Sequence, residues 1–257
     1  MTRIIVCGCF GRLGAAICKL AKEDTATELI AGIDVVTPAG EAGFPVFTNF
    51  KDCESPADAV VICMPPSAAD EVAAVVNTCT ARKIPIVLCT TALPDAVMDA
   101  VKKSAENIAV LASANMSLGI NLLNYMIGKA TRLLHDANFD IEIIERHHNK
   151  KLDAPSGTAY LLANTANAAL DGKMTLTTDH SPHKTPRNRN EIGLHALRGG
   201  TFIGEHTVVY AGLDEVVELT HIAQSRDVFA AGALKAAQFV KENPAGYYSM
   251  QDLIEGV

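Results

Sequence analysis

Short apolar runs alternate with amphipathic stretches over the first part of the chain. Runs of this length bounded by polar or glycine residues are typical of buried strands, and they predict strands over residues 3–7, 28–34, 45–48, 58–63, 84–89 and 108–112. Apolar residues at helical spacing between them predict helices over 15–22, 68–81 and 94–104. This β–α alternation predicts a parallel sheet with helices on both faces. Ligands of such sheets bind beyond the carboxyl ends of the strands.

The pattern changes in the second half of the chain. It predicts a long apolar helix over 120–134, a strand over 139–146, a helix over 159–170 and closely spaced strands over 192–197, 202–211 and 215–222. Gly199 and Gly200 predict a tight hairpin turn between the first two of these closely spaced strands. Because closely spaced strands usually pair antiparallel, this half predicts an α+β domain.

These elements together predict an α/β fold class. We expect a Rossmann-like doubly wound parallel sheet and a second α+β domain that contains a mixed four-stranded oligomerisation sheet. A final helix over 227–241 is expected to return to the first sheet, so the predicted domains are 1–118 plus 227–257, and 119–226. The second domain has too few helices to cover both faces of four strands. We therefore expect self-association through the uncovered face into a closed oligomer.

A polar stretch over 171–191 interrupts the second domain and contains His180, His183, Lys184, Arg187 and Arg189. Two interpretations remain open, a solvated loop and a functional lid, because long loops in compact domains are often functional. The two histidines have no third ligand nearby in the sequence, so we expect no metal site.

Composition and charge exclude several classes of protein. The chain carries a net charge of −7 with no basic tract, which argues against general binding of nucleic acid or of membrane surfaces. No apolar run approaches the roughly 18 residues of a membrane span, and the first apolar run is too short for a signal peptide, so we expect a cytoplasmic protein. Seven cysteines without a C-x-x-C pair indicate reduced, mostly buried thiols.

The first predicted strand leads into a glycine loop and then a helix, the context that a phosphate-binding turn requires. Gly8 permits a tight turn, Gly11 lets a pyrophosphate approach the backbone, and Gly14 lets the helix pack on the strand. Asp34 ends the next strand, where a carboxylate accepts hydrogen bonds from a ribose 2′-hydroxyl, although a turn or capping aspartate is the ordinary alternative. A carboxylate at this position favours NADH. Arg12 in the glycine loop is a cation that can bind a 2′-phosphate, so NADPH remains possible.

The carboxyl ends of the predicted parallel strands place several loops around one crevice. The predicted cofactor-binding residues in these loops are Gly8, Cys9, Phe10, Gly11, Arg12, Leu13, Asp34, Cys89, Thr90, Thr91, Ser113, Ala114, Asn115 and Met116. Residues 64–66 lie at the same edge.

A second concentration of chemistry lies between the strand over 139–146 and the helix over 159–170. His147, His148 and Lys151 lie at the strand end, and Pro155 and Ser156 are typical first-turn residues of a helix. The N–H groups and positive dipole end of that helix favour an anion. We therefore predict a site for a carboxylate substrate with an acid or a cation beside it. The alternative is a solvated basic loop before a well-capped helix.

Residues 145–159 read Glu-Arg-His-His-Asn-Lys-Lys-Leu-Asp-Ala-Pro-Ser-Gly-Thr-Ala. This stretch closely resembles the signature E-x-H-H-x-x-K-x-D-A-P-S-G-T-A of the dihydrodipicolinate reductase family, with every fixed position filled. The resemblance extends along the chain to the N-terminal G-x-x-G-R-x-G, Thr90-Thr91, Ala114-Asn115, Arg198-Gly-Gly200, Gly204-Glu-His-Thr207, Glu218-Leu-Thr-His221 and Ser225-Arg226.

The resemblance implies reduction of 4-hydroxy-tetrahydrodipicolinate to tetrahydrodipicolinate with NADH or NADPH, in diaminopimelate and lysine biosynthesis. It implies His147 as catalytic acid/base and Lys151 as proton donor or cationic stabiliser. It also implies a homotetramer. The residues expected to bind the small cyclic dicarboxylate are His148, Ser156, Gly157 and Thr158.

This chain departs from the family pattern in the cofactor domain. Cys9 and Phe10 stand where small residues are usual, Cys89 and Ala92 where glycines are common, and Met116 where an aromatic residue is common. These departures bear on cofactor affinity and on the balance of NADH and NADPH more than on the chemistry.

The sequence leaves two other functions open. One is a different two-domain NAD(P)-dependent dehydrogenase of a small carboxylated substrate. The phosphorylating semialdehyde kind needs a nucleophilic cysteine at the domain junction, and no cysteine follows Cys89, which disfavours it. The other is a non-catalytic dinucleotide-sensing module, which would leave the array over 147–158 without a purpose.

Overall fold

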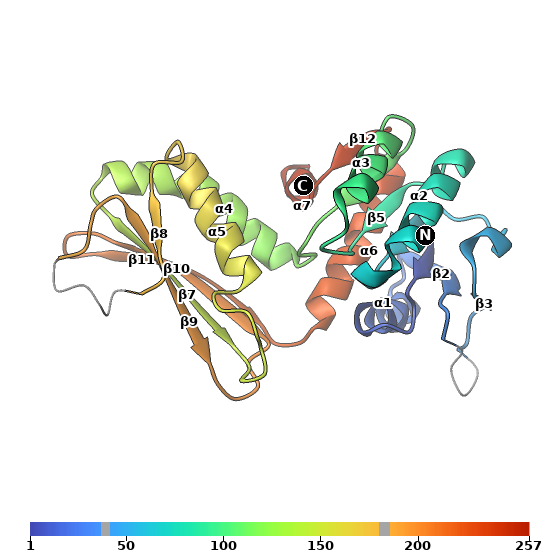
Figure 1. Cartoon of the computed structure of the whole chain (residues 1–257), viewed down its shortest axis with the longest axis horizontal. Helices are drawn as coiled ribbons and strands as arrows, with labels where there is room; N and C mark the ends of the chain where they lie inside the picture. Colours follow the sequence, from blue (N-terminus) through green and yellow to red (C-terminus); the bar gives the residue numbers. More distant parts are fainter. Residues whose placement is uncertain (37–41, 180–185, 257) are drawn as a thin grey trace. The chain divides into compact units, whose positions relative to one another are not determined.

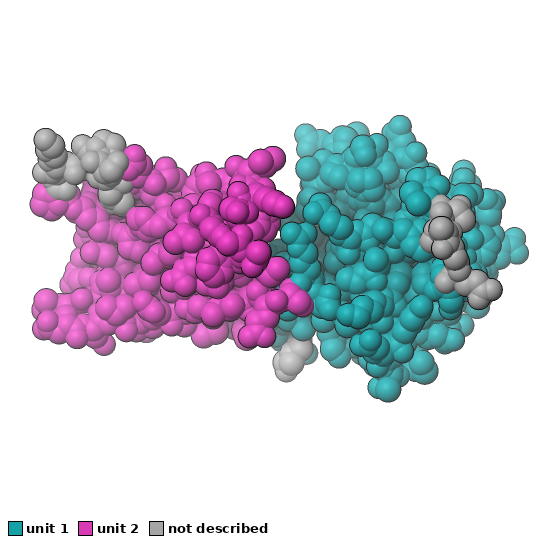
Figure 2. Space-filling model, turned by 90° about the horizontal axis from the view of Figure 1, so that it is seen from below, with its two compact units in different colours: residues 1–118, 226–257 teal, residues 119–225 magenta. Residues whose placement is uncertain are grey.

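The computed structural model describes residues 1–36, 42–179 and 186–256. The chain forms two compact units, drawn as a ribbon in Figure 1 and coloured separately in Figure 2. Unit 1 comprises Met1–Leu118 and Arg226–Val257, and unit 2 comprises Gly119–Ser225.

Unit 1 is built on a parallel sheet, which has seven strands within the described residues, in the order β12-β6-β5-β4-β1-β2-β3. The strands are β1 (Thr2–Cys7), β2 (Thr27–Ile33), β3 (Val46–Phe47), β4 (Ala59–Ile62), β5 (Ile86–Leu88), β6 (Ala109–Ala112) and β12 (Gly246–Tyr248). Every strand predicted in this part of the chain is present. The strand β12 was not predicted, because its residues, Gly-Tyr-Tyr, form no aliphatic run of the kind that indicates a buried strand.

Helices cover both faces of this sheet, each over its own core. The helices are α1 (Arg12–Glu23), α2 (Ala69–Arg82), α3 (Asp95–Ser104), α6 (Asp227–Glu242) and α7 (Met250–Glu255), with short 3-10 turns η1 (Phe50–Asp52) and η2 (Pro66–Ala68). One core joins α1, α6 and α7 to the sheet, and the other joins α2 and α3 to the opposite face. The predicted doubly wound fold is confirmed, and it places the strand ends that carry the glycine loop and Asp34 at one edge.

Unit 2 contains a mixed sheet in the order β11-β10-β7-β9-β8, with one face covered by two helices (Figure 1). Its elements are α4 (Leu118–Asp136), β7 (Asp140–His147), α5 (Gly157–Ala169), β8 (Thr175–Thr177), β9 (Glu191–Arg198), β10 (Gly204–Ala211) and β11 (Val216–Ala223). The described sheet has five strands instead of the expected four. The extra strand, β8, lies inside the polar stretch over 171–191, where no apolar alternation marks it.

The prediction of a hairpin at Gly199 and Gly200 is wrong. Strand β7 lies between β9 and β10, parallel to the first and antiparallel to the second. Residues 199–203 cross the end of β7, where Gly199 N–H donates to the carbonyl of His147 (3.0 Å) and His148 N–H donates to that of Phe202 (2.8 Å). A loop of this length spans the roughly 10 Å between two strands separated by a third. The insertion places β7, with its alternating apolar residues, at the centre of the sheet.

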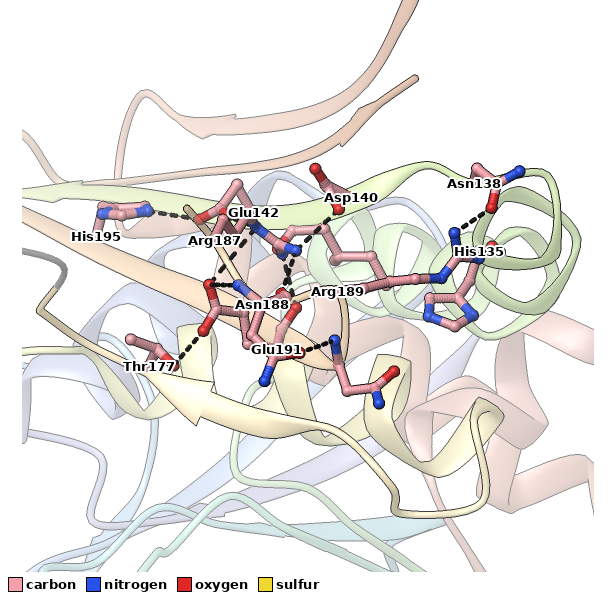
Figure 3. Close-up of polar contacts among 12 residues, drawn as sticks. His135, Asn138, Asp140, Glu142, Thr177, Arg187, Asn188, Arg189, Glu191 and His195 are labelled. Carbon is pink, nitrogen blue, oxygen red and sulfur yellow. Dashed lines mark hydrogen bonds and ion pairs between the residues drawn. The ribbon is translucent and has the colours of Figure 1, made fainter. Parts of the chain in front are cut away.

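Two arginines fix the end of the polar stretch over 171–191, Arg187 to the sheet and Arg189 to the end of helix α4 and the turn after it (Figure 3). Arg187 donates from Nε to Glu142 Oε1 (2.7 Å), from Nη1 to Asp140 Oδ1 (2.9 Å) and from Nη2 to two carbonyls. Arg189 donates to Asn138 and to the carbonyl of His135. The described end of this stretch is therefore held in place rather than free in solvent. His180, His183 and Lys184 lie outside the described residues.

The face of the unit 2 sheet opposite the helices carries exposed apolar side chains, namely Ile144, Leu197, Val216 and Ile222. Among the described helices of both units, none combines the length and the apolarity that crossing a bilayer requires.

Candidate active site

The glycine loop of unit 1 has the geometry of a phosphate-binding turn. Gly8 has a positive φ of 83°, and a Cβ there would lie 2.9 Å from the carbonyl oxygen of Cys63. A Cβ at Gly14 would overlap the carbonyl of Gly8, so helix and loop pack this closely only without side chains. Helix α1 begins after Gly11 without a side-chain cap. Its first-turn N–H groups are therefore suited to an anionic group.

A pocket of about 550 Å³ opens beside this loop, and Gly8, Phe10, Gly11 and Asp34 line it. Asp34 Oδ2 accepts the backbone N–H of Phe10 (2.9 Å), and Oδ1 accepts that of Val36 (3.1 Å). The carboxylate is thus held at the pocket wall, where a ribose hydroxyl can reach it. These residues fit a dinucleotide cofactor.

The other predicted cofactor residues do not line this pocket. Cys9 is only 1% exposed, and its sulfur packs where a side chain at Gly32 would go, so it offers a ligand only its backbone. Thr90 Oγ1 donates to the carbonyl of Met64 (2.9 Å), which ties the ends of β5 and β4 together. The remaining predicted residues lie at the start of α1 and after β5 and β6, namely Arg12, Leu13, Cys89, Thr91, Ser113, Ala114, Asn115 and Met116.

The pocket also has walls that sequence reasoning missed. They come from the segments after β2 and β3 and from one side of α2, and include Val35, Val36, Thr48, Asn49, Lys51, Glu71, Ala74, Val75 and Thr78. Lys51 brings a cation to the same pocket as Asp34. It follows a two-residue strand that carries little sequence signal, so no motif marks it.

The predicted substrate site in unit 2 is built around Glu145, whose side chain is fully buried. Its Oε2 accepts hydrogen bonds from His147 Nδ1 (2.6 Å) and Arg198 Nη1 (2.7 Å). Its Oε1 accepts them from Arg198 Nη2 (2.7 Å) and from the backbone N–H of Ser156 (3.0 Å). Burial by itself raises the pKa of Glu145, but these donors outweigh it and hold the pKa below its usual value. The carboxylate is therefore ionised.

His147 lies at the end of β7 with little exposed surface. Burial lowers its pKa, the charges of Lys151 and Arg198 act in the same direction, and Glu145 opposes them. Since an ionised Glu145 can only accept, a neutral His147 carries its hydrogen on Nδ1. The other ring nitrogen, Nε2, lies beside Gly204, where an added Cβ would come within 3.1 Å of it.

Helix α5 begins beside this histidine. Ser156 is its N-cap, and its Oγ accepts the N–H of Ala159 (3.2 Å) and contacts His206 Nε2 (3.2 Å). Burial lowers the pKa of His206 to about 3, so this ring stays neutral, and it meets the His147 ring edge-on at 5.2 Å. A Cβ at Gly157 would touch nothing within 4 Å, so the helix start is open at this point.

Lys151 and His148 complete the group. Lys151 Nζ pairs with Asp153 (2.9 Å), and its backbone N–H donates to the carbonyl of His148 (3.1 Å). Within the described residues, His148 Nδ1 is buried without a partner. Thr158 is the second residue of α5. The structure therefore brings the predicted unit 2 residues together at the end of β7 and the start of α5.

Sequence reasoning gave no role to three residues of this cluster, Glu145, Arg198 and His206. All three lie in segments that carry the family resemblance, so the signal was present without an assignment. Arg198 is 53 positions from Glu145, and His206 is 50 positions from Ser156, so only the paired strands show that they meet.

Known proteins match both units. The family model for the N-terminus of dihydrodipicolinate reductase matches residues 2–116, and the model for its C-terminus matches residues 119–254. The 4-hydroxy-tetrahydrodipicolinate reductase of Caldanaerobacter subterraneus subsp. tengcongensis is 42% identical over 99% of both chains. The chain belongs to the dihydrodipicolinate reductase family. The enzyme of the same name from Clostridium tetani is 40% identical over 99% of this chain and 97% of its own.

A solved structure agrees on the fold. A dipicolinate-bound dihydrodipicolinate reductase from Paenisporosarcina sp. TG-14 has a TM-score of 0.80 to this chain at 21% identity, and the match covers 98% of this chain and 99% of that one. As a dihydrodipicolinate reductase family member, the chain is an NAD(P)H-dependent oxidoreductase, which confirms the family, enzyme class and cofactor implied by the resemblance. The match also decides against a sensing module and against other two-domain dehydrogenases.

Proposed function

We propose that this chain reduces 4-hydroxy-tetrahydrodipicolinate to tetrahydrodipicolinate, in diaminopimelate and lysine biosynthesis. The 4-hydroxyl of the substrate leaves as one water. One double bond of the dehydrated ring is then reduced by one hydride and one proton, and NAD(P)H is converted to NAD(P)⁺. The observation that carries the proposal is the match to this family over nearly the whole chain, joined to an intact signature at residues 145–159.

The start of α5 is the proposed carboxylate site. Ser156 was predicted to bind the substrate, but it is buried, its N–H donates to Glu145 and its Oγ accepts the N–H of Ala159, so it fixes the position of the helix start instead. Gly157, at the open edge, and the adjacent Thr158 lie at the positive end of the helix dipole, which favours a carboxylate. His148 and Lys151 add donors beside it. A small cyclic dicarboxylate supplies the negative charge that these groups favour.

We propose that His147 exchanges the proton and that Lys151 stabilises the developing negative charge. When a nicotinamide cofactor is bound, it supplies the hydride. The electron density that moves to the ring nitrogen of the substrate needs a cation or an acid close to it. Lys151 provides the cation, and His147, with Nδ1 held by Glu145, has Nε2 for proton exchange.

The proposed cofactor site is the loop from Gly8 to Leu13 with Asp34 and the loops after β5 and β6. The carboxylate of Asp34 accepts ribose hydroxyls and repels a 2′-phosphate, which favours NADH. Lys51 in the same pocket offsets part of that repulsion. We therefore propose that both cofactors serve, with NADH the better of the two.

Assembly and location belong to the same proposal. The exposed apolar side chains Ile144, Leu197, Val216 and Ile222 on the uncovered sheet face support self-association, for which we propose a homotetramer. Seven cysteines without a disulfide support a reducing, cytoplasmic location.

A coupled assay tests the activity. Aspartate semialdehyde and pyruvate are condensed by the preceding synthase, and the loss of nicotinamide absorbance is followed with NADH and with NADPH. We expect absorbance to fall only when the synthase, both precursors and this protein are present. No loss of absorbance with either cofactor would refute the proposed reaction.

A further inference from the structure

We propose that Glu145, anchored by Arg198, is a positioning residue that fixes His147 with its hydrogen on Nδ1 and presents Nε2 as the working nitrogen. This inference deepens the proposed function and rests on it, because it names the group that prepares His147 for proton transfer. Glu145 itself is fully buried and has no path to a substrate.

Hydrogen bonds from two segments hold the carboxylate of Glu145 in one position. Arg198 holds it in a two-pronged pair, with both distances at 2.7 Å, and Arg198 Nη2 also donates to the carbonyl of Asp153 (2.6 Å). The N–H of Ser156 donates to the same carboxylate (3.0 Å). The carboxylate is thus tied to β9 and to the start of α5 at once.

Glu145 determines which nitrogen of His147 carries the hydrogen. An ionised carboxylate 2.6 Å from Nδ1 can only accept, so the neutral ring is protonated at Nδ1. No described residue hydrogen-bonds Nε2, which lies beside the backbone of Gly204. The lone pair at Nε2 is then available to take or return a proton at the substrate.

The surroundings of His147 disfavour its protonation. The charged and titratable groups facing it are Glu145 on its own strand, Arg198 on β9, His206 on β10 and Lys151 in the loop that follows β7. Burial of the ring and the positive charges of Lys151 and Arg198 lower the pKa of His147, and Glu145 is the group that raises it. Removing the charge of Glu145 therefore makes His147 harder to protonate.

Glu145→Gln is the informative change, because it keeps the shape of the side chain. Its amide oxygen can still accept from Arg198 or Ser156, but its NH₂ group meets the Nδ1 hydrogen of His147 and forces the other tautomer. We expect kcat to fall about 10- to 100-fold, with little change in the binding of NADH. The limb of the kcat–pH profile that reports His147 should move to lower pH.

A matched control lies on the opposite face of the same strand. Glu142 also accepts from an arginine and a histidine, Arg187 and His195, and it is remote from the start of α5. Glu142→Gln should keep kcat within about twofold of wild type. Sedimentation of both variants checks that they assemble alike.

A double-mutant cycle separates positioning from general damage. If Glu145 acts through His147, Glu145→Gln costs no more than about twofold in kcat once His147 is already Gln. An equal cost in both backgrounds overturns the inference, because it shows that Glu145 supports the fold and not the histidine.

The tautomer of His147 in the wild-type protein gives an answer even if a variant fails to fold. In ¹⁵N NMR spectra, with the His147→Gln variant used for assignment, we expect the neutral ring to show a protonated Nδ1 and an unprotonated Nε2. The opposite tautomer overturns the inference. The coupled assay on wild type is a separate readout, so loss of the proposed function and loss of this inference are distinguishable.

Discussion

Unit 2 carries two clusters of the same three residue types on opposite faces of one sheet. The inner cluster consists of Glu145, His147 and Arg198. The outer cluster, drawn in Figure 3, consists of Glu142, His195 and Arg187. In each, a glutamate of β7 accepts from one arginine and from one histidine. Burial separates them, since the Glu145 side chain is 0% exposed and that of Glu142 is 22% exposed.

Because of this difference in burial, the same three residue types have different roles in the two clusters. In the inner cluster the histidine lies beside the start of a helix that favours an anion, so a fixed imidazole has a ligand to act on. In the outer cluster Arg187 donates hydrogen bonds to Asp140, Glu142 and backbone carbonyls. These bonds hold the end of a long loop against the sheet. The inner cluster prepares chemistry, whereas the outer cluster holds a chain segment.

The largest expected effect comes from removing the arginine of the inner cluster. Arg198→Leu leaves the fully buried carboxylate of Glu145 with the neutral donors of His147 and Ser156 but without a counter-charge, and breaking a buried ion pair in this way costs about 3–5 kcal/mol. Urea unfolding should show a loss of that size in the free energy of unfolding. A loss below about 1 kcal/mol would mean that Glu145 does not depend on Arg198 as its counter-charge.

The next effect is a pH dependence of stability that arises from His206, beside the inner cluster. Burial lowers its pKa to about 3, so below pH 6.5 the unfolded chain takes up this proton before the folded one does. The free energy of unfolding therefore decreases as the pH is lowered, and this group accounts for a loss of about 2 kcal/mol between pH 7 and pH 5. His206→Gln should remove that part of the slope. Identical slopes for wild type and variant in urea unfolding would contradict the assignment.

The smallest effect is expected in the outer cluster. Arg187→Leu removes several hydrogen bonds, but Glu142 and Asp140 are partly exposed and regain water, so the cost should be about 1–2 kcal/mol. We expect kcat in the coupled assay to stay within about twofold of wild type. A loss of kcat as large as that of Glu145→Gln would erase the distinction between the clusters.

The sequence predicted what depends on neighbouring residues and missed what depends on distant ones. The apolar runs gave the parallel strands, and the Pro155-Ser156 turn gave the start of α5, because both signals are local. Strand order is not local, so the insertion of β7 between β9 and β10 was mistaken for a hairpin at Gly199 and Gly200.

The site divides in the same way. His147, Lys151 and the helix start lie within one stretch and could be singled out together. The partners that fix them come from β9 and β10, and no spacing rule links Glu145 to a residue 53 positions away. The strands β8 and β12 were missed for a different reason, since Thr-Leu-Thr and Gly-Tyr-Tyr contain no apolar run of the kind that indicated the other strands.

The most direct test of the central claim is the kcat of Lys151→Ala beside that of Lys150→Ala. Lys151 is proposed as the cation at the reacting ring, whereas Lys150 is its exposed neighbour. We predict that Lys151→Ala lowers kcat at least 100-fold while the Kd for NADH is unchanged, and that Lys150→Ala keeps kcat within about twofold of wild type. Turnover by Lys151→Ala equal to that of wild type would contradict the account.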